Sequence, residues 1–410
     1  LNSRLRDHKV PQDIAALLCG PYAAYKLRPQ PQLRNVPGDF SSDTTFHYSM
    51  APSPYDAHDP KRSMGAYMSP LTDAPAVAPY KSISNDISCV IGRVVTCATY
   101  PDMNNKEVLS AMKFFAANIV PERIEPYTFE MLNAHQRRAT QREKNRLGGL
   151  CSGEDYVKEH ISSFQKAEAY GKITHPRNIS PYRPSANTAI CTHYMAMAEC
   201  LKKFSWYAFS KKPTEVARQV QRVAQTALDL SRDTLHVQSL EGDLSRQDGT
   251  INELMRKLEY YMLSNAFGRE KAKQVQGLII QNMAFTKFGV AYQQGDTRGS
   301  GSGGTSFNNT AGLVFTLFYA LVKQGYTYRD AFDLLDKCVI AGGDDNFSAL
   351  IEPDTLVSAA TACGLVMTIT PRSLDEDHPA GPTMLARYYA PDVHFGNTNS
   401  MTDISRALSK

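Results

Sequence analysis

The stretch AGGDDNF, residues 341–347, places two adjacent carboxylates, Asp344 and Asp345, behind a glycine pair in an otherwise apolar segment. The flanking residues DKCVI and SALI have the apolar character of buried strands, so the segment predicts a strand–turn–strand hairpin with the acids at its tip. Neighbouring carboxylates raise each other's pKa unless a cation lies between them. Gly, Asp and Asn are also ordinary turn residues, so the tip is either a cation-binding site or a solvated turn.

The bulk composition is that of a folded chain. It has 410 residues, of which 42% are hydrophobic and 21% charged, and this length predicts at least two subdomains. The net charge of +4 permits an anionic partner without requiring one. The longest apolar run, 311–322, is too short for a membrane span, and the sequence contains no signal peptide. Because the chain begins with Leu1 rather than Met, we expect it to be part of a longer protein.

The cysteines argue against a disulfide framework and against a zinc finger. None of the eight forms a C-x-x-C pair, and no group of Cys and His has zinc-finger spacing. We therefore expect reduced, mostly buried thiols in a cytosolic compartment.

The first part of the chain changes character near residue 85. Residues 1–85 are rich in proline and aromatic residues, and we interpret them as an extended segment that wraps or links a larger body. Residues 86–170 become helical, with helices predicted in 107–120 and 127–147. The second of these helices carries five basic residues, a pattern typical of a solvated helix face.

From about residue 236 the pattern becomes sharper. The predicted order is strand, helix, helix, hairpin, helix, strand, which is the split βαβ plan of a ferredoxin-like sheet with one added helix. The fold class is therefore α+β. The predicted elements lie, in this order, at 236–245, 251–267, 307–325, 336–351, 354–364 and 365–370.

A second acidic cluster lies at the end of the first predicted strand, where Asp243 and Asp248 are five residues apart. Strand ends on one edge of a sheet can bring Asp243 close to Asp344. Three or four carboxylates meeting there would bind Mg²⁺ or Mn²⁺, both of which take oxygen ligands. A calcium site is the competing interpretation, but the EF-hand spacing with its final Glu is absent.

The glycine-rich stretch RGSGSGGTSFNNT, residues 298–310, leads directly into an apolar helix. It lacks the Lys that a phosphate-binding P-loop requires after its last Gly. A flexible linker would not lead at once into such a helix. A loop whose backbone moves close to nucleic acid fits better. Thr305 and Asn309, four residues apart at the start of the helix, would present polar groups on one face.

A basic stretch, residues 164–180, precedes the predicted sheet. Its Lys166, Lys172 and Arg177 lie among turn residues and follow no helical period. Such side chains suit the binding of a triphosphate, because Arg holds phosphate in a bidentate fork. A surface loop with scattered charge is the alternative.

Taken in order, these motifs resemble those of the RNA-dependent RNA polymerases of positive-strand RNA viruses. The stretch KAEAYGK-x₄-R resembles motif F, D-x₄-D at 243–248 motif A, SG-x₂-GTS-x₂-N at 300–309 motif B, and GDD at 343–345 motif C. Within that superfamily the chain most resembles nodavirus and noda-like replicases, through DLSRQDG, MLARYYAPD and TDISRALSK. The resemblance is loose over 1–160 and good over 160–410.

The resemblance implies a right-hand polymerase, with fingers, a palm built on a ferredoxin-like or RRM-like sheet, and the start of a thumb, preceded by an extended linker. In these terms 1–85 is the linker, 86–235 the fingers with motif F at 164–180, and 236–390 the palm, which carries motifs A to E and a fingers insertion at 268–298. Residues 391–410 begin the thumb.

The resemblance also implies a reaction, in which an RNA 3′-hydroxyl attacks the α-phosphate of an NTP on an RNA template. Asp243 and Asp344 would hold two Mg²⁺ or Mn²⁺ ions, with Asp345 assisting. The basic residues of 164–180 named above would contact the triphosphate.

Further residues carry implied roles in nucleotide selection. Asp248 and Asn309, helped by Thr305, would recognise the ribose 2′-hydroxyl, which separates RNA from DNA building blocks. Ser300 and Gly301 would lie in the mobile loop that positions template and base. The segment 383–390 resembles motif E, the hairpin that grips the 3′ end of the product.

The chain departs from the family's pattern at motif D. The lysine proposed to protonate pyrophosphate is expected near 365–370, where this chain has Thr368. Arg372 and Lys337 are candidate substitutes, although Arg is a poor proton donor because its pKa exceeds about 12. Most of the thumb and the family's capping and membrane-anchoring regions are expected outside this chain.

Two other interpretations remain open. A reverse transcriptase shares the palm and the metal pair, but it usually has an aromatic residue at the position of Asp248 and Y-x-D-D instead of G-D-D. A non-catalytic role, as an RNA-binding or ring-forming part of a replication complex, would use 1–85 to pack against neighbouring copies. The expected partners are template and product RNA, NTPs, other copies of the chain and other replicase regions. We expect the protein to be located in the host cytoplasm, at virus-modified membranes that it contacts through parts outside this chain.

Overall fold

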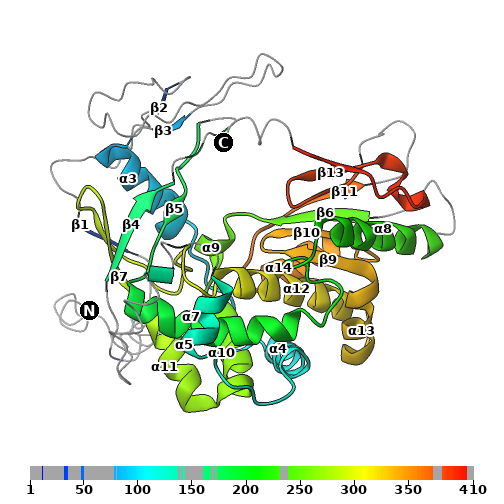
Figure 1. Ribbon diagram of the computed structural model, residues 1–410, viewed down its shortest axis with the longest axis horizontal. Helices are drawn as coiled ribbons and strands as arrows, with labels where there is room; N and C mark the ends of the chain where they lie inside the picture. Colours follow the sequence, from blue (N-terminus) through cyan, green and yellow to red (C-terminus); the bar gives the residue numbers. More distant parts are fainter. Residues whose placement is uncertain are drawn as a thin grey trace.

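The computed structural model describes most of the chain from residue 81 onward (Figure 1). The predicted extended segment, 1–85, therefore lies almost wholly outside the described residues, apart from the short strands β1 (Gln32–Asn35), β2 (Tyr48–Ser49) and β3 (Ala78–Pro79). The described residues are 12, 32–35, 48–49, 78–79, 81–136, 139, 142–143, 160–166, 168, 170, 173–230, 239–372 and 381–403.

A four-stranded antiparallel sheet forms the centre of the predicted palm. Its strands lie in the order β11-β6-β10-β9, which is the order of a ferredoxin-like sheet. The sheet and its hairpin thus form as the sequence pattern predicts. The strands are β6 (Ser239–Leu244), β9 (Val339–Gly342), β10 (Asp345–Ala349) and β11 (Met367–Arg372).

The register of β6 and β10 decides where the acidic residues meet. Asp345 lies directly opposite Asp243, and Asn346 lies opposite Gly242. The Asn346 side chain donates a hydrogen bond of 2.8 Å to the Gly242 carbonyl, and a Cβ at Gly242 would lie 2.6 Å from that amide nitrogen. Only glycine leaves room for this contact, so Gly242 helps to fix the register.

The helices that cover the sheet bury long apolar faces. Helix α12 (Thr305–Lys323) is buried over nearly its whole length and packs on α14 (Pro353–Ala362) and β9. Helix α13 (Tyr328–Cys338), which the sequence pattern did not predict, begins at an N-cap formed by Thr327. Helix α8 (Pro213–Leu230) also contacts β9 and β10, so these two strands are buried along most of their length.

Below the sheet in Figure 1, a bundle of helices joins the predicted palm to the predicted fingers. The predicted helix at 251–267 is α10, capped by the Asn252 side chain, and the predicted helix at 107–120 is α4. The bundle consists of α4 (Lys106–Ile119), α5 (Phe129–His135), α7 (Pro184–Leu201), α10 (Glu253–Phe267) and α11 (Arg269–Ile279).

A second sheet collects strands from three distant parts of the chain. Its order is β1-β8-β7-β4-β5, and β4 pairs with β7 in parallel. The segments that we assigned to the fingers, 164–180 and 268–298, thus share one sheet. The remaining strands are β4 (Ile161–Gln165), β5 (Asn178–Ile179), β7 (Met283–Thr286) and β8 (Ala291–Gln293).

The third sheet contains the predicted motif E. Strands β12 (Thr383–Met384) and β13 (Arg387–Tyr389) form a hairpin, and β14 (Ser400–Thr402) pairs with β13. Strand β12 also contacts β10, so this hairpin adjoins the central sheet.

Six cysteines are described, and all are free, as expected. Burial raises the pKa of the Cys191 thiol to about 11 and those of the Cys338 and Cys363 thiols to about 12. None of the described helices is both long enough and apolar enough to cross a membrane.

An aromatic cluster connects the helix bundle to the sheet-covering helices. Phe318 of α12 contacts the rings of Phe114 and Phe115 from α4 and of Phe332 from α13. Phe318 is fully buried, so its ring contributes both transfer free energy and packing of α12 against two other helices.

We predict that Phe318→Ala lowers the free energy of unfolding by about 3–5 kcal/mol, because it leaves a cavity where three helices meet. Chemical denaturation followed by circular dichroism measures this change. The control Val357→Ala, on the exposed face of α14, should change the free energy by no more than about 0.5 kcal/mol. Equal losses in the two variants would contradict this view of the core.

Candidate active site

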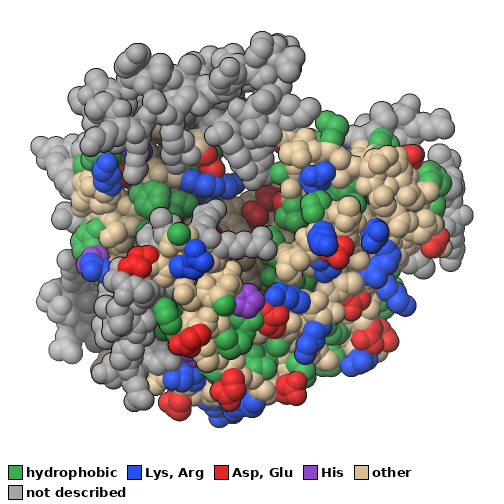
Figure 2. Space-filling model, in the orientation of Figure 1, with side chains coloured by type: hydrophobic (Ala, Val, Ile, Leu, Met, Phe, Trp, Pro, Cys, Tyr) green, Lys and Arg blue, Asp and Glu red, His purple; other side chains and the backbone are tan. Residues whose placement is uncertain are grey.

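A cavity of about 480 Å³ opens where β6 ends and the β9–β10 hairpin turns. Asp243 and Asp344 both line it, although they lie far apart in the sequence. Figure 2 shows this face of the molecule hollowed near its centre, with acidic side chains in the hollow and basic ones on its rim. The two predicted acidic clusters therefore meet in one cavity.

The hairpin tip is a two-residue turn that is tied to the helix below it. Gly343 has a positive φ of 73°, which favours glycine, and its N–H donates a hydrogen bond of 2.9 Å to the Thr310 hydroxyl of α12. Asp344, the second residue of the turn, is exposed to solvent in the cavity. Packing against α12 thus holds the carboxylate in place.

The electrostatics of Asp243 indicate a carboxylate whose repulsion by Asp344 is only partly compensated. Burial raises the pKa of Asp243, the charge of Asp344 raises it further, and Arg177 partly offsets both effects. Two like charges held close by the fold are costly unless a cation lies between them. The pair is therefore suited to bind a cation.

The donor set fits a magnesium or manganese ion better than a metal enclosed by protein. No group of three or more His, Cys, Asp or Glu side chains that could hold a metal occurs among the described residues, so the expected meeting of three or four carboxylates is not seen there. Mg²⁺ commonly takes one or two carboxylates and completes its shell with water and substrate phosphates. Asp243 and Asp344 can supply those carboxylates.

Asp345, the third predicted acidic ligand, is placed differently. It begins β10, is half-buried and lies opposite both Asp243 and Gly342. It is not among the residues that line the cavity. Its role as an assisting metal ligand stays a prediction.

The structure brings Asp248 and Asn309 together, and their role in ribose binding stays a prediction. The Asn309 side-chain amide donates a hydrogen bond of 2.9 Å to Oδ1 of Asp248, and both residues line the cavity. Arg298, the first residue of the glycine-rich stretch, lies with Nε 3.9 Å from the same carboxylate oxygen. The sequence analysis did not single out Arg298.

The glycine-rich loop reaches the cavity only in part. Ser300 lines the cavity, and its carbonyl accepts a hydrogen bond of 2.7 Å from the Ser180 N–H. Gly301 has a φ of 123° and packs on the Ser180 backbone, outside the lining. Thr305 begins α12 and its hydroxyl lies 3.5 Å from the Gly299 carbonyl, so it does not share the cavity with Asn309.

The predicted triphosphate-binding stretch forms one wall of the cavity. Lys166 and Arg177 both line it, and the Lys166 N–H donates a hydrogen bond to the Arg177 carbonyl. Glu168 forms ion pairs with the two side chains, at 2.8 Å to Lys166 and 3.3 Å to Arg177. Lys172 lies outside the described residues.

Two further arginines line the cavity, and the sequence analysis missed both. Arg93 comes from a single π-helical turn, η1 (Ile91–Val95), and Arg246 occupies a left-handed backbone conformation with φ of 50°. Burial lowers the pKa of Arg93, and the nearby charges of Arg246 and Arg177 lower it further. Three mutually repelling guanidinium groups around one cavity favour an anionic ligand.

The candidate substitutes for the missing motif D lysine lie away from the acidic pair. Thr368 is opposite Asp243, whereas Arg372 is opposite Ser239, at the other end of the strand, and pairs with Glu241 at 2.8 Å. Lys337 lies in the last turn of α13, before β9. Neither Arg372 nor Lys337 lines the cavity, so neither is placed to donate a proton there.

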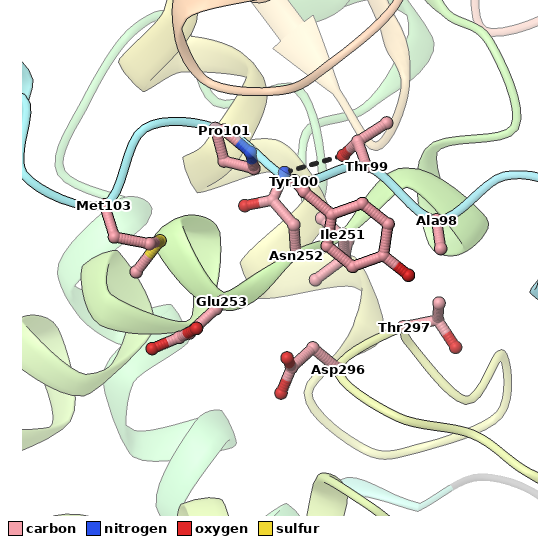
Figure 3. Close-up of a pocket in the computed structure, with 10 residues that line it drawn as sticks. All are labelled: Ala98, Thr99, Tyr100, Pro101, Met103, Ile251, Asn252, Glu253, Asp296 and Thr297. Carbon is pink, nitrogen blue, oxygen red and sulfur yellow. Dashed lines mark hydrogen bonds between the residues drawn. The ribbon is translucent and has the colours of Figure 1, made fainter. Parts of the chain in front are cut away.

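A second, water-sized cavity of about 20 Å³ lies behind the first (Figure 3). Thr297 lines both cavities, and Figure 3 shows the carboxyl groups of Glu253 and Asp296 beside this space. Burial raises the pKa of Asp296 to about 6, while Arg256 opposes this effect. The small volume excludes a nucleotide, so the larger cavity is the candidate active site.

The sequence is similar to those of viral RNA-directed RNA polymerases. No protein-family model matches the chain. An RNA-directed RNA polymerase of Pieris rapae virus is 28% identical over 327 residues, which cover 77% of this chain and 31% of that protein. The RNA-directed RNA polymerase of greasy grouper nervous necrosis virus is 26% identical over 370 residues, 86% of this chain and 35% of that protein.

Nodaviruses are among these relatives, as the resemblance implied. The RNA-directed RNA polymerase of Pariacoto virus is 26% identical over 330 residues, 78% of this chain and 32% of that protein. The resemblance to viral RNA-directed RNA polymerases is thereby confirmed. The chain spans about a third of the length of the curated relatives that it matches.

Solved structures identify the fold. The crystal structure of the RNA-dependent RNA polymerase of a human picobirnavirus matches with a TM-score of 0.58 at 14% identity, over 80% of this chain and 64% of that one. Its insertion-loop deletion mutant matches with a TM-score of 0.59 at 15% identity, over 80% of this chain and 66% of that one. The chain therefore has the fold of viral RNA-dependent RNA polymerases, which confirms the predicted fold class.

We predict that Asp344→Asn raises the melting temperature in metal-free buffer at neutral pH, because it removes one of two like charges and keeps the turn chemistry. The folded-state pKa of Asp243 lies above its ordinary value, so this cost is present at pH values above the raised pKa. It should disappear as the pH falls through the raised pKa of Asp243, because the protonated carboxyl group no longer repels a neighbouring charge. Scanning calorimetry with a chelator, at several pH values, measures the difference.

Added Mg²⁺ or Mn²⁺ should stabilise the parent chain more than Asp344→Asn, since the ion needs both carboxylates. Asp333→Asn, in an exposed ion pair on α13, serves as the control and should behave as the parent. A variant that melts at or below the parent's temperature without metal would show that the acidic pair carries no repulsion.

Proposed function

We propose that the chain is the polymerase part of a viral replicase and joins ribonucleotides on an RNA template. One observation carries this proposal: Asp243 and Asp344 meet at the floor of a cavity that also holds the Asp248–Asn309 pair and a basic wall. The similarity to viral RNA-directed RNA polymerases supports it.

The acidic pair would hold the ions of the reaction. Bound divalent cations supply activation of the attacking 3′-hydroxyl and stabilisation of the leaving pyrophosphate. Asp243 and Asp344 bind from the strand end and from the hairpin tip, so the α-phosphate would lie over the edge of the sheet. Lys166 and Arg177 face this point from another wall of the cavity and would bind and orient the triphosphate.

Selection of the ribose would fall to Asp248 and Asn309. A 2′-hydroxyl both donates and accepts hydrogen bonds. The Asp248 carboxylate can accept a hydrogen bond from this hydroxyl group. Asn309 already orients the carboxylate through a hydrogen bond of 2.9 Å. A deoxyribose would not make this hydrogen bond. The free-energy cost of the missing bond would favour NTPs over dNTPs.

The same proposal covers partners and location. Template and product RNA and NTPs are the ligands of the cavity. Other copies of the chain, other replicase regions and a membrane contact would involve parts of a longer protein, and virus-modified membranes in the host cytoplasm would be the place of action. The chain's span of about a third of its relatives supports such additional parts.

Primer extension on an RNA template tests the function directly. We expect incorporation that requires Mg²⁺ or Mn²⁺ and that Asp344→Ala lowers by at least about a hundredfold, because one of the two carboxylates for the ions is lost. Asp333→Ala should leave incorporation unchanged.

RNA binding, measured on the same preparations, distinguishes the alternative function. Retained RNA binding with lost incorporation supports catalysis. An Asp344→Ala variant that supports replication as well as the parent would indicate a non-catalytic, RNA-binding or ring-forming role.

For the ribose, we predict that Asp248→Ala and Asn309→Ala reduce the preference for NTPs over dNTPs by about tenfold or more, with little change in divalent-ion binding. Competing incorporation of ATP and dATP measures the preference, and calorimetric titration with Mn²⁺ measures the ions. Equal ATP-to-dATP ratios in parent and variants would remove both residues from this role.

A further inference from the structure

Behind the ribose-binding pair lies a row of buried charges. Arg256 and Glu259, one turn apart on α10, form an ion pair of 2.7 Å, and Glu259 binds Arg298 at 2.6 Å. The side chains are only 5%, 3% and 2% exposed, respectively. Buried charges that are not fully paired cost free energy. The stability of the fold therefore does not by itself explain why this network is buried.

Within this network, the Glu259 carboxylate is shared by two guanidinium groups. Burial alone would raise the pKa of Glu259, but Arg256 and Arg298 outweigh burial and hold it below its usual range. Glu259 is therefore ionised, and one carboxylate faces two guanidinium groups. The nearest further carboxylate to Arg298 is Asp248, 3.9 Å from Nε.

Arg298 itself is only partly satisfied. Its Nη2 binds Glu259, whereas Nε and Nη1 are buried and have no hydrogen-bond partner. Arg298 lines the large cavity, and its Nε lies 3.9 Å from the Asp248 carboxylate, which lines the same cavity. Unpartnered buried donors on a cavity wall indicate a contact that forms when the cavity is filled.

The backbone around Arg298 is fixed from both sides. Arg256 donates hydrogen bonds to the carbonyls of Asp296 and Thr297, at 2.8 and 3.0 Å. The Arg298 N–H donates to the carbonyl of Asp248 at 2.8 Å. The backbone that carries the Arg298 side chain is thus held by Arg256 of helix α10 and by the Asp248 carbonyl.

We propose that Arg298, held by Glu259, is a positioning residue for ribose selection. It keeps the Asp248 carboxylate turned toward the 2′-hydroxyl, and it closes the remaining gap of 3.9 Å to that carboxylate when a ribonucleotide binds. This inference rests on the proposed function, because it assigns the origin of its sugar specificity. Glu259, more than ten residues from either motif, would then control which sugar is accepted.

The test compares ATP with dATP in two ways, on the full chain with Mg²⁺. Steady-state incorporation gives the ratio of kcat/KM values, and calorimetric titration gives the ratio of Kd values. Arg298→Lys keeps the charge but cannot bind Glu259 and Asp248 together. We expect it to lower both ratios by about tenfold, through a higher KM for ATP and an unchanged KM for dATP.

Two further variants separate positioning from general damage. Glu259→Gln should lower the ratios in the same direction, and it carries the test if Arg298→Lys melts below the assay temperature. In an Asp248→Ala background, Arg298→Lys should change the ratios no further, since the carboxylate that it orients is gone. Arg329→Lys, in an exposed ion pair on α13, is the matched control and should keep the parent's ratios.

The outcomes distinguish this inference from the proposed function. A parent chain that incorporates nothing, yet binds ATP more tightly than dATP in a way that Arg298→Lys abolishes, supports the inference and contradicts the polymerase assignment. Folded variants that keep the parent's ratios, additive losses in the Asp248→Ala background, or a parent that binds both nucleotides equally would each overturn the inference.

Discussion

The antiparallel register between β6 and β10 is the constraint on which the site depends. Side chains alternate faces along a strand, so a shift by one residue would turn Asp243 away from the hairpin tip. The register is held by the close contact of Asn346 with Gly242 and by the burial of β10 along most of its length. Two carboxylates are thus forced together by packing whose energy comes from apolar residues elsewhere.

The arrangement of the cavity follows from this enforced proximity. Repulsion at the acidic edge favours cations, whereas Arg93, Arg177 and Arg246 line the same cavity and favour anions. A metal-bound triphosphate satisfies both walls at once, because it carries cations and phosphates in one ligand. Neither wall alone would select such a ligand, and each is destabilised by its own like charges until it is bound.

How much of this the sequence predicts depends on whether the cause is local. The hairpin and the meeting of Asp243 with Asp344 follow from strand periodicity and turn chemistry, whereas the joint role of Asp248 and Asn309 was implied only by the resemblance to viral polymerases. Arg93 and Arg246 do not, because a π-helical turn and a left-handed backbone place them. Arg372 was considered for its closeness to Thr368 in sequence, but the pairing of β11 places it at the opposite end of the strand.

The buried network of Arg256, Glu259 and Arg298 has the same non-local origin, and its cost is informative. Apolar side chains of similar size are often at least as stabilising as a buried ion pair. Its retention behind Asp248 is therefore better explained by orientation than by stability. A carboxylate that distinguishes a sugar with a 2′-hydroxyl from one without it must point in a fixed direction. Buried guanidinium groups are rigid and hold that direction better than an exposed loop would. In this arrangement the specificity of the cavity is set from helix α10, behind the motifs that contact the nucleotide.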